Sequence, residues 1–186
     1  MECFRWQCIG SLRMDEKETT LLVAKKFHVV RREENRNGGP PLSQEIVLHP
    51  GAVAMVAMVD ADHVCLIKNR RIAVGETLIE LPAGTLEPGE NPQIAAAREL
   101  AEETGYRAGK MMLLTECFMS PGILRERMHI FIATELVEGA MSLADDEQIE
   151  PIIVRWSEAM QMVEDGRIQD AKSIVGLLSC DRIRSK

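Results

Sequence analysis

The chain has 186 residues, of which 46% are hydrophobic and 27% charged, so it is long enough for one globular domain with a substantial core. Its net charge of −7 argues against a broad surface for nucleic acid or anionic membranes, since such surfaces need clustered basic residues. The five cysteines are scattered without metal-type spacing and indicate free thiols in a reducing cytoplasm. No signal peptide or membrane-spanning segment is evident, so we expect a soluble protein.

Hydrophobic patterning predicts strands on both sides of one acidic helix. Residues 1–18 fit no element and are expected to form an N-terminal arm, while residues 19–186 form a single domain. Gly and Pro mark a hairpin loop at 37–41, and two helices should close the chain, one starting near the cap Ser157 and one near Asp170. This order indicates an α+β layered domain. The expected strands are 20–31, 44–48, 52–59, 63–68, 78–82, 111–118, 128–137 and 149–155.

The acidic helix is predicted to run from Pro92 to Thr104. Asn91 can cap it, Pro92 suits the first helical position, and Gly105 can take the left-handed conformation that ends helices. At about 100° per residue, three apolar residues fall on one side and three glutamates on the other. We expect the apolar side to pack on a sheet and the carboxylates to point outward. The two sets are Ile94, Ala97 and Ala101, and Glu99, Glu102 and Glu103.

The three glutamates are placed against ordinary helix electrostatics. Glu99 stands three and four residues before Glu102 and Glu103, so like charges repel by roughly a few tenths of a kcal/mol per pair. They also lie near the C-terminal end, where the helix dipole disfavours negative charge. A solvated acidic face is the ordinary alternative. A bound divalent cation would remove both penalties, and oxygen-only ligands indicate a hard ion such as Mg²⁺.

The segment from Gly84 to Tyr106, GTLEPGENPQIAAARELAEETGY, resembles the Nudix box, G-x5-E-x7-R-E-U-x-E-E-x-G-U, in which U is a bulky apolar residue. Tyr106 takes the last, usually aliphatic, position, and no fixed position is missing. The resemblance implies a Nudix-type α/β/α sandwich with a mixed sheet and an N-terminal antiparallel strand region. It also implies hydrolysis that depends on Mg²⁺, for which Mn²⁺ can substitute. The matching residues are Gly84, Glu90, Arg98, Glu99, Leu100, Glu102, Glu103 and Gly105.

Two further segments are similar to ADP-ribose pyrophosphatases and related nucleoside-diphosphate-sugar hydrolases. Residues 79–84 read I-E-L-P-A-G, and Pro121 stands fifteen residues after Tyr106, a spacing associated with that group. The implied reaction splits the pyrophosphate bond of ADP-ribose or a related sugar nucleotide into a nucleoside monophosphate and a sugar phosphate. The same chemistry on a GDP- or UDP-sugar or a dinucleotide stays open, as does a non-catalytic nucleotide-binding regulator. The intact box favours catalysis.

The metal ligands are expected to be Glu99, Glu102 and Glu103, with the carbonyl of Ala83 added by the resemblance. Arg98 lies about 100° off the acidic face, so it is better placed to pair with Glu90 and brace the loop before the helix. Arg98 and Glu90 are therefore assigned a supporting part in catalysis.

A base that activates water must come from elsewhere in the chain. The resemblance points to Glu147, which lies in the polar loop 145–147, and it keeps Glu126 in reserve. Without the resemblance, an acidic loop of this kind would be interpreted as solvated surface.

The substrate contacts are expected to include Arg71, Glu80 and Pro121. Arg71 matches a phosphate- or ribose-binding arginine, although residues 69–71 read Asn-Arg-Arg where the group often has Gln-Tyr-Arg. Arg71 can equally be a surface charge, and Glu80 either touches the nucleoside or faces solvent. His49 is interpreted as structural, and the segment 170–173, Asp-Ala-Lys-Ser, as a helix start without a catalytic part.

The resemblance further implies a homodimer in which the strands of residues 19–50 contact the partner. Trp6 and Phe27 are candidates for stacking on adenine, and either can instead belong to the interface or the core.

Overall fold

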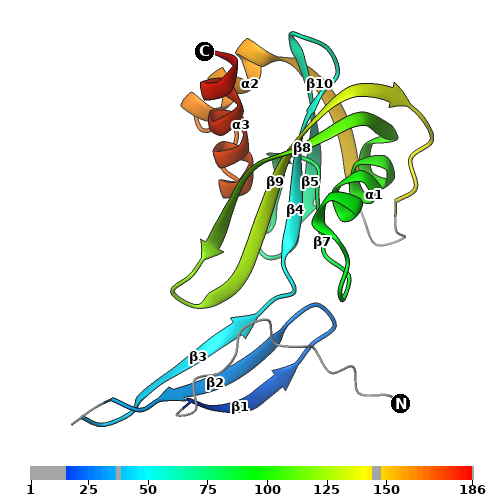
Figure 1. Cartoon of the computed structure of the whole chain (residues 1–186). Helices are drawn as coiled ribbons and strands as arrows, with labels where there is room; N and C mark the ends of the chain where they lie inside the picture. The colour runs from blue at the N-terminus through cyan, green and yellow to red at the C-terminus, as the bar shows by residue number, and fades with distance from the viewer. Residues whose placement is uncertain (1–15, 37–38, 144–147, 186) are drawn as a thin grey trace.

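The computed structural model describes residues 16–36, 39–143 and 148–185 (Figure 1). Within these ranges the chain forms a mixed sheet with helices on both of its faces, as the sequence predicts. The elements, in chain order, are β1 (Glu16–Val23), β2 (His28–Glu34), β3 (Leu42–Leu48), β4 (Ala52–Met58), β5 (His63–Arg71), β6 (Glu76–Glu80), β7 (Ala83–Thr85), α1 (Pro92–Thr104), β8 (Tyr106–Ser120), β9 (Leu124–Glu138), β10 (Ile149–Arg155), α2 (Trp156–Glu164) and α3 (Ala171–Arg184).

The sheet follows the order β1-β2-β3-β9-β4-β5-β10, with β6 on β5, β7 on β4 and β8 on β9. Strand β9 runs parallel to both β3 and β4, whereas the remaining pairs are antiparallel. The three N-terminal strands extend away from the rest of the sheet (Figure 1). The predicted mixed sheet and N-terminal antiparallel region are therefore confirmed.

Strand β4 lies at the centre of the molecule, and all seven of its residues are buried. Because side chains alternate along a strand, Val56 packs in the core beneath α2 and α3, whereas Met55 packs in the core beneath α1. Figure 1 shows α1 on one side of the sheet and the two C-terminal helices on the other. The architecture is the expected α/β/α sandwich.

The caps of α1 are confirmed, but its predicted buried face is wrong. The Asn91 side chain accepts a hydrogen bond from the N–H of Gln93, and Gly105 ends the helix with φ 77°. The buried residues of α1 are Ala95, Ala96, Leu100, Glu103 and Thr104, whereas Ile94 is 65% exposed. This face can be buried because two small alanines allow close packing and Glu103 meets a hydrogen-bond donor inside.

Three other expectations about elements are corrected. The run 20–31 is two strands, because the chain turns at residues 24–27, where the N–H of Ala24 donates to the carbonyl of Phe27. The short strand β7 was not predicted. Helix α2 begins at Trp156, ahead of the expected cap Ser157, since the N–H of Trp156 donates to the carbonyl of Asp62. The Asp170 cap of α3 is confirmed by its bond from the N–H of Ser173.

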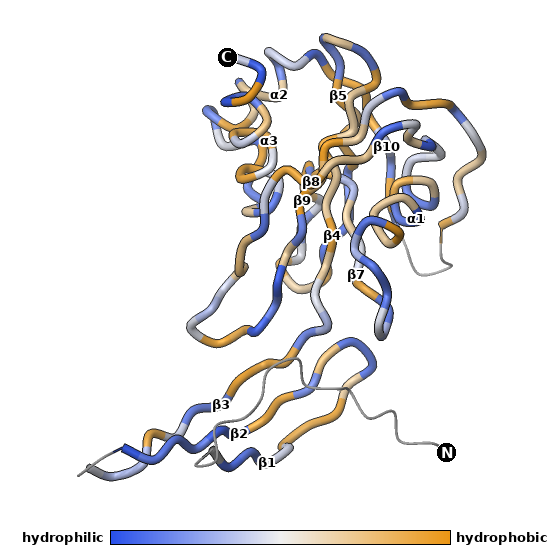
Figure 2. The backbone as a smooth tube through the Cα atoms, viewed as in Figure 1, coloured by the Kyte–Doolittle hydropathy of each residue, from blue (hydrophilic) through white to orange (hydrophobic). Residues whose placement is uncertain are grey.

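The N-terminal sheet carries apolar residues that the main core does not cover. Strand β1 begins at Glu16, and Figure 2 shows apolar stretches along β1, β2 and β3. Residues 1–15, which include most of the expected arm and Trp6, lie outside the described residues. The exposed apolar side chains of this sheet are Leu21, Leu22, Val23, Phe27 and Leu42. None of the helices in the described part of the chain is both long and apolar enough to cross a membrane.

Candidate active site

One arginine on α1 organises three carboxylates. The Nε and Nη2 atoms of Arg98 donate to Glu90, each over 3.0 Å, while its Nη1 donates to Glu99 over 2.7 Å and to Glu102 over 3.1 Å. The hydrogen bonds that Arg98 donates to Glu90 come first among the effects that raise the pKa of Arg98, and in return the guanidinium lowers the pKa of Glu90. The expected pairing of Arg98 with Glu90 is therefore present, and Arg98 also reaches the acidic face.

Glu90 connects this arginine to the loop that precedes α1. Its carboxylate accepts a hydrogen bond from the N–H of Glu87 over 3.0 Å, and its own N–H donates to the carbonyl of Glu87 over 3.0 Å. These bonds close the turn 87–90 between β7 and α1. Arg98 and Glu90 together hold the loop against the helix.

Glu99 lies directly against β7 at Gly84. A Cβ atom placed on Gly84 would stand 1.8 Å from the Glu99 Cδ and 2.1 and 2.2 Å from its two carboxylate oxygens. Only a glycine leaves this space open, since such contacts are far inside van der Waals range. The glycine of β7 thus forms a cradle for the first glutamate of the acidic face.

Glu103 does not point outward, contrary to the expectation for all three glutamates. It is 3% exposed, and its Oε2 accepts a hydrogen bond from the N–H of Ala83 over 2.8 Å. The backbone donor compensates for part of the cost of burying the carboxylate. Ala83, Gly84, Glu99 and Glu103 therefore meet where β7 and α1 come together.

The described residues contain no preformed group of three His, Cys, Asp or Glu side chains placed to hold a metal. Glu99 and Glu102 instead share Arg98, and Glu103 binds the backbone of Ala83. The donor set nevertheless suits a hard divalent cation, because all its side chains are carboxylates. Two of them, Glu99 and Glu102, already approach one positively charged nitrogen, so a single small cation can reach both.

Glu80 is not placed as expected, because it neither faces solvent nor offers a surface to a nucleoside. Its residue exposure is 0%, and its carboxylate accepts two hydrogen bonds from Arg71, over 2.8 and 2.6 Å, and one from Lys172. A fully buried carboxylate needs such partners, since an unpaired charge is costly in the interior. Glu80 therefore acts on the site by holding the guanidinium of Arg71.

Arg71 is the more accessible member of this pair, and its side chain is 41% exposed. Hydrogen bonding to Glu80 is the main cause that raises the pKa of Arg71, and the charges of Asp170 and Glu103 act in the same direction. Arg71 therefore lies within electrostatic reach of the buried Glu103 of α1. Its expected contact with substrate phosphate or ribose remains a prediction.

Of the two candidate bases, the structure describes only Glu126. Glu147 lies outside the described residues. Glu126 is in β9, half-buried, with its Oε1 3.3 Å from the Nδ1 of His49. Burial lowers the pKa of His49, the nearby Lys26 lowers it further, and the Glu126 charge opposes both. His49, interpreted as structural from the sequence, thus contacts a candidate base.

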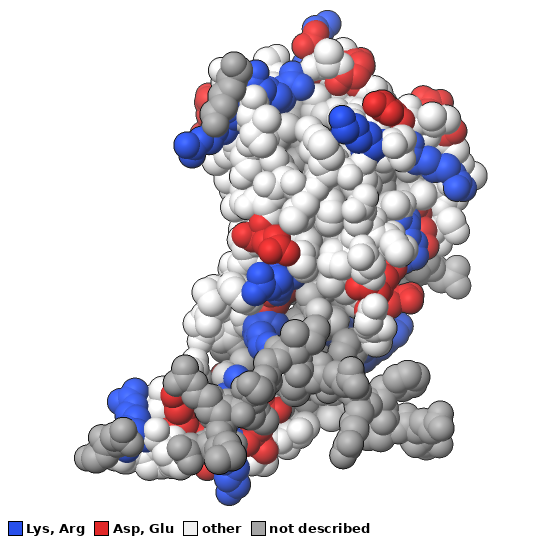
Figure 3. Space-filling model, in the orientation of Figure 1, with Lys and Arg blue, Asp and Glu red and all other residues white. Residues whose placement is uncertain are grey.

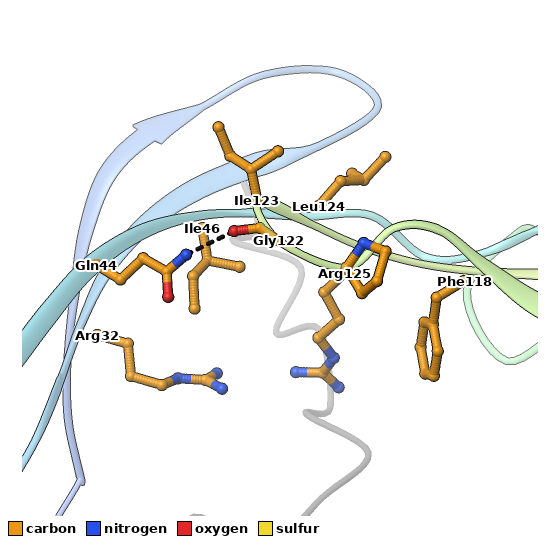
Figure 4. A pocket seen from close by; sticks show the side chains of 9 residues that line it. Arg32, Gln44, Ile46, Phe118, Gly122, Ile123, Leu124 and Arg125 are labelled. Carbon is orange, nitrogen blue, oxygen red and sulfur yellow. Dashed lines mark hydrogen bonds between the residues drawn. The ribbon is translucent and has the colours of Figure 1, made fainter.

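Pro121 lies in the turn between β8 and β9, as expected of its sequence, and lines a pocket of about 270 Å³ beside β2 and β3 (Figure 4). Gln44 of β3 donates to the carbonyl of Gly122 over 2.6 Å and so ties the turn to the N-terminal sheet. Figure 4 shows the guanidinium groups of Arg32 and Arg125 pointing toward one another across the pocket. The Nη2 of Arg32 also donates to Glu18 over 2.6 Å, so part of the positive charge at this pocket is already paired.

Three contributions were not predicted from the sequence. Arg32 and Gln44 line the pocket at Pro121, and Lys172 binds the carboxylate of Glu80. For Lys172 a signal existed in the segment 170–173, but its partner lies 92 residues away in the chain. On the face shown in Figure 3, acidic and basic side chains lie beside one another with uncharged areas between them. The expectation that the protein binds neither nucleic acid nor membranes stays a prediction.

Comparison with known proteins agrees with this geometry. The family model of the NUDIX domain matches residues 48–176. The chain is 42% identical over 137 residues to the ADP-ribose pyrophosphatase of Bacillus subtilis strain 168, covering 73% of this chain and 74% of that one. It is 36% identical over 135 residues to the GDP-mannose pyrophosphatase of Klebsiella pneumoniae subsp. pneumoniae, covering 67% of each.

A solved structure described as an ADP compounds hydrolase superposes with a TM-score of 0.79 at 24% identity, over 89% of this chain and 90% of that one. This likeness confirms the fold. The family match and the sequence relatives establish that the chain belongs to the Nudix hydrolase family.

Proposed function

We propose that the protein hydrolyses the pyrophosphate bond of ADP-ribose or a related nucleoside diphosphate sugar, with Mg²⁺ as its metal and Mn²⁺ as a substitute. The products would be a nucleoside monophosphate and a sugar phosphate. The observation that carries this proposal is the arrangement on α1, in which Arg98 binds Glu90, Glu99 and Glu102 beside the cradle at Gly84. The name of the Bacillus subtilis relative supports ADP-ribose as the first substrate to test.

The metal would be held by Glu99, Glu102 and Glu103, with the Ala83 carbonyl as a further oxygen donor. When bound, a divalent cation neutralises diphosphate charge and lowers the pKa of water. Gly84 leaves room for the Glu99 carboxylate, and the N–H of Ala83 holds Glu103 in place. Arg98 keeps the like charges of Glu99 and Glu102 together at one end of the helix.

Arg71 would bind the diphosphate, because it presents an exposed guanidinium held at its other edge by Glu80. The pocket at Pro121 is the second substrate region in this proposal. Its lining combines Arg125 with the apolar side chains of Phe118 and Ile46, which suits the outer part of a sugar nucleotide.

Glu147 would act as the general base, with Glu126 as the reserve. Replacing Glu147 with glutamine keeps its size and removes its basicity, so kcat should fall by roughly 10²–10⁴-fold while metal affinity stays nearly unchanged. The matched change is Glu126→Gln. If Glu126→Gln causes the larger fall in kcat and Glu147→Gln is nearly silent, the assignment is reversed.

A second candidate substrate is a GDP-sugar, and the similarity to a GDP-mannose pyrophosphatase favours it over a UDP-sugar or a dinucleotide. The test is a direct comparison of kcat/KM for ADP-ribose, GDP-mannose and a UDP-hexose with the same preparation. We expect ADP-ribose to be the best of these. A tenfold preference for a GDP-sugar, about 1.4 kcal/mol in the barrier, would refute that choice. Binding without turnover of any of them would support the non-catalytic regulator.

The proposal includes a homodimer formed through the N-terminal sheet. Strands β1–β3 extend from the domain, and they expose apolar side chains that a monomer would leave in water, among them Leu22, Val23 and Phe27. Light scattering should give twice the mass of the chain, and a monomer at micromolar concentration would contradict this.

The free thiols of Cys65, Cys117 and Cys180 suit a reducing compartment, and we assign the enzyme to the cytoplasm.

A further inference from the structure

We propose that Lys172 is a positioning residue for substrate binding, which acts through the buried carboxylate of Glu80 to fix the guanidinium of Arg71. This inference rests on the proposed function, in which Arg71 binds the diphosphate. Lys172 lies in the first turn of α3, far in sequence from both of the residues through which it acts.

Glu80 is shared between two cations. Its Oε1 accepts a hydrogen bond from the Arg71 Nε over 2.8 Å, while its Oε2 accepts from the Arg71 Nη2 over 2.6 Å and from the Lys172 Nζ over 2.5 Å. The side chains of Glu80 and Lys172 are 1% and 8% exposed, whereas that of Arg71 is 41% exposed. Lys172 is therefore too buried to meet substrate itself, and Arg71 is the member of the group that can.

Lys172 is itself held in place by the start of α3. Its Nζ lies 2.9 Å from the Oδ2 of Asp170, the same oxygen that accepts the capping bond from the N–H of Ser173. The Ser173 hydroxyl donates to Asp170 and accepts a hydrogen bond from the N–H of Leu81 over 2.7 Å. The first turn of α3 thus contacts both Glu80 and the residue that follows it.

These contacts make the position of Arg71 depend on Lys172. Arginine has a long side chain, and fixing it before substrate arrives removes part of the entropy cost of binding. Without Lys172, the Oε2 of Glu80 keeps only Arg71, so the carboxylate can turn and take the guanidinium with it. The remaining N–H groups of Arg71 would then no longer be aimed at the diphosphate.

The alternative is that Lys172 only ties α3 to the sheet. Ser173 provides the matched control, because Ser173→Ala removes the hydroxyl contacts with Leu81 and Asp170 while leaving the direct contacts of Lys172 with Glu80 and of Glu80 with Arg71 in place. A purely structural role predicts that Lys172→Met and Ser173→Ala have similar effects on substrate affinity when they destabilise the protein to a similar degree.

The test measures the Kd of ADP-ribose by calorimetry without metal, and KM and kcat with Mg²⁺, in the full chain. We expect Lys172→Met to raise Kd and KM by about tenfold with kcat within about threefold of the wild type. Lys172→Arg should restore most of the affinity, and Ser173→Ala should leave it unchanged. In an Arg71→Gln background, Lys172→Met should cause no further loss, because the two residues act through one contact.

Unchanged Kd and KM in Lys172→Met, or an equal loss in the Arg71→Gln background, would overturn the proposal. If Lys172→Met does not fold, the Glu80→Gln/Lys172→Met double variant removes both buried charges and tests the same contact, and normal affinity in that variant would also overturn it. The calorimetric arm separates this result from failure of the proposed function. A wild type that binds ADP-ribose without cleaving it refutes the proposed catalysis alone, and the change in Kd still decides the part of Lys172.

Discussion

Replacing Gly84 with alanine should disable the enzyme while leaving it folded. The added Cβ would stand 1.8 Å from the Glu99 Cδ, and an ordinary carbon contact is about 3.5 Å, so the carboxylate must move by roughly 1.7 Å. The φ of Gly84 is not in the left-handed region, so alanine can adopt its backbone conformation. The atoms in the way are the far end of a flexible side chain, which can move without disturbing the sheet.

This displacement takes Glu99 out of its contact with Arg98 at 2.7 Å. A misplacement of about 1 Å in an active site can cost about 10²-fold in rate, so kcat/KM for ADP-ribose should fall at least about 100-fold, equivalent to roughly 2.7 kcal/mol. The free energy of unfolding should change by less than about 1 kcal/mol. Product release with Mg²⁺ measures the first quantity, and urea unfolding measures the second.

Gly39→Ala is the matched control, because a Cβ on Gly39 has no described neighbour within 4 Å. It should retain full activity and stability. A folded Gly84→Ala enzyme with more than about a third of the wild-type kcat/KM would refute the claim that Glu99 must lie against β7. A large loss of stability would refute the claim that the side chain alone absorbs the clash.

Two further predictions concern the supports of the site. Arg98→Lys replaces a planar group that spans Glu90 and Glu99 with a single ammonium. Activity or metal affinity should therefore fall by about 10–100-fold. A Mg²⁺ titration of activity that superposes on that of the wild type would contradict this. The lowered pKa of His49 means that the folded state resists its protonation, so its contribution to stability is complete above pH 6.5 and is lost as the pH falls through the lowered value. The free energy of unfolding, measured with urea, should therefore fall less between pH 7.5 and acid pH in His49→Gln than in the wild type. An equal fall in both proteins would show that His49 is not its cause.

The parts of the fold that depend on local chemistry could be predicted from the sequence. Asn91, Pro92 and Gly105 set the bounds of α1 because capping requires only nearby backbone groups. The hairpin at residues 24–27 was missed, since the lysines that interrupt the apolar run of 20–31 carry a weaker signal than glycine or proline.

The parts of the site that depend on distant partners could not be predicted. Arg98 and Glu90 are eight residues apart, with Glu90 just before α1 and Arg98 within it, so their pairing follows from spacing. Burial of Glu80 and Glu103 depends instead on Lys172 and on the backbone of Ala83, which lie 92 and 20 residues away. A single sequence shows charged residues at these positions, and charge alone predicts exposure.

The metal dependence of ADP-ribose cleavage tests the proposed site, and it is measured as the rate at which the purified protein releases AMP with Mg²⁺, with chelator, and after Mg²⁺ is restored. Glu102→Gln serves as the paired variant, because Glu102 shares Arg98 with Glu99 and its carboxylate is partly exposed. We predict AMP and ribose 5-phosphate in equal amounts with Mg²⁺, loss of the reaction in chelator, recovery on restoring the metal, and a much higher metal requirement in the variant. Cleavage that continues at full rate in chelator, or a variant with the wild-type metal requirement, would contradict a metal held by the glutamates of α1.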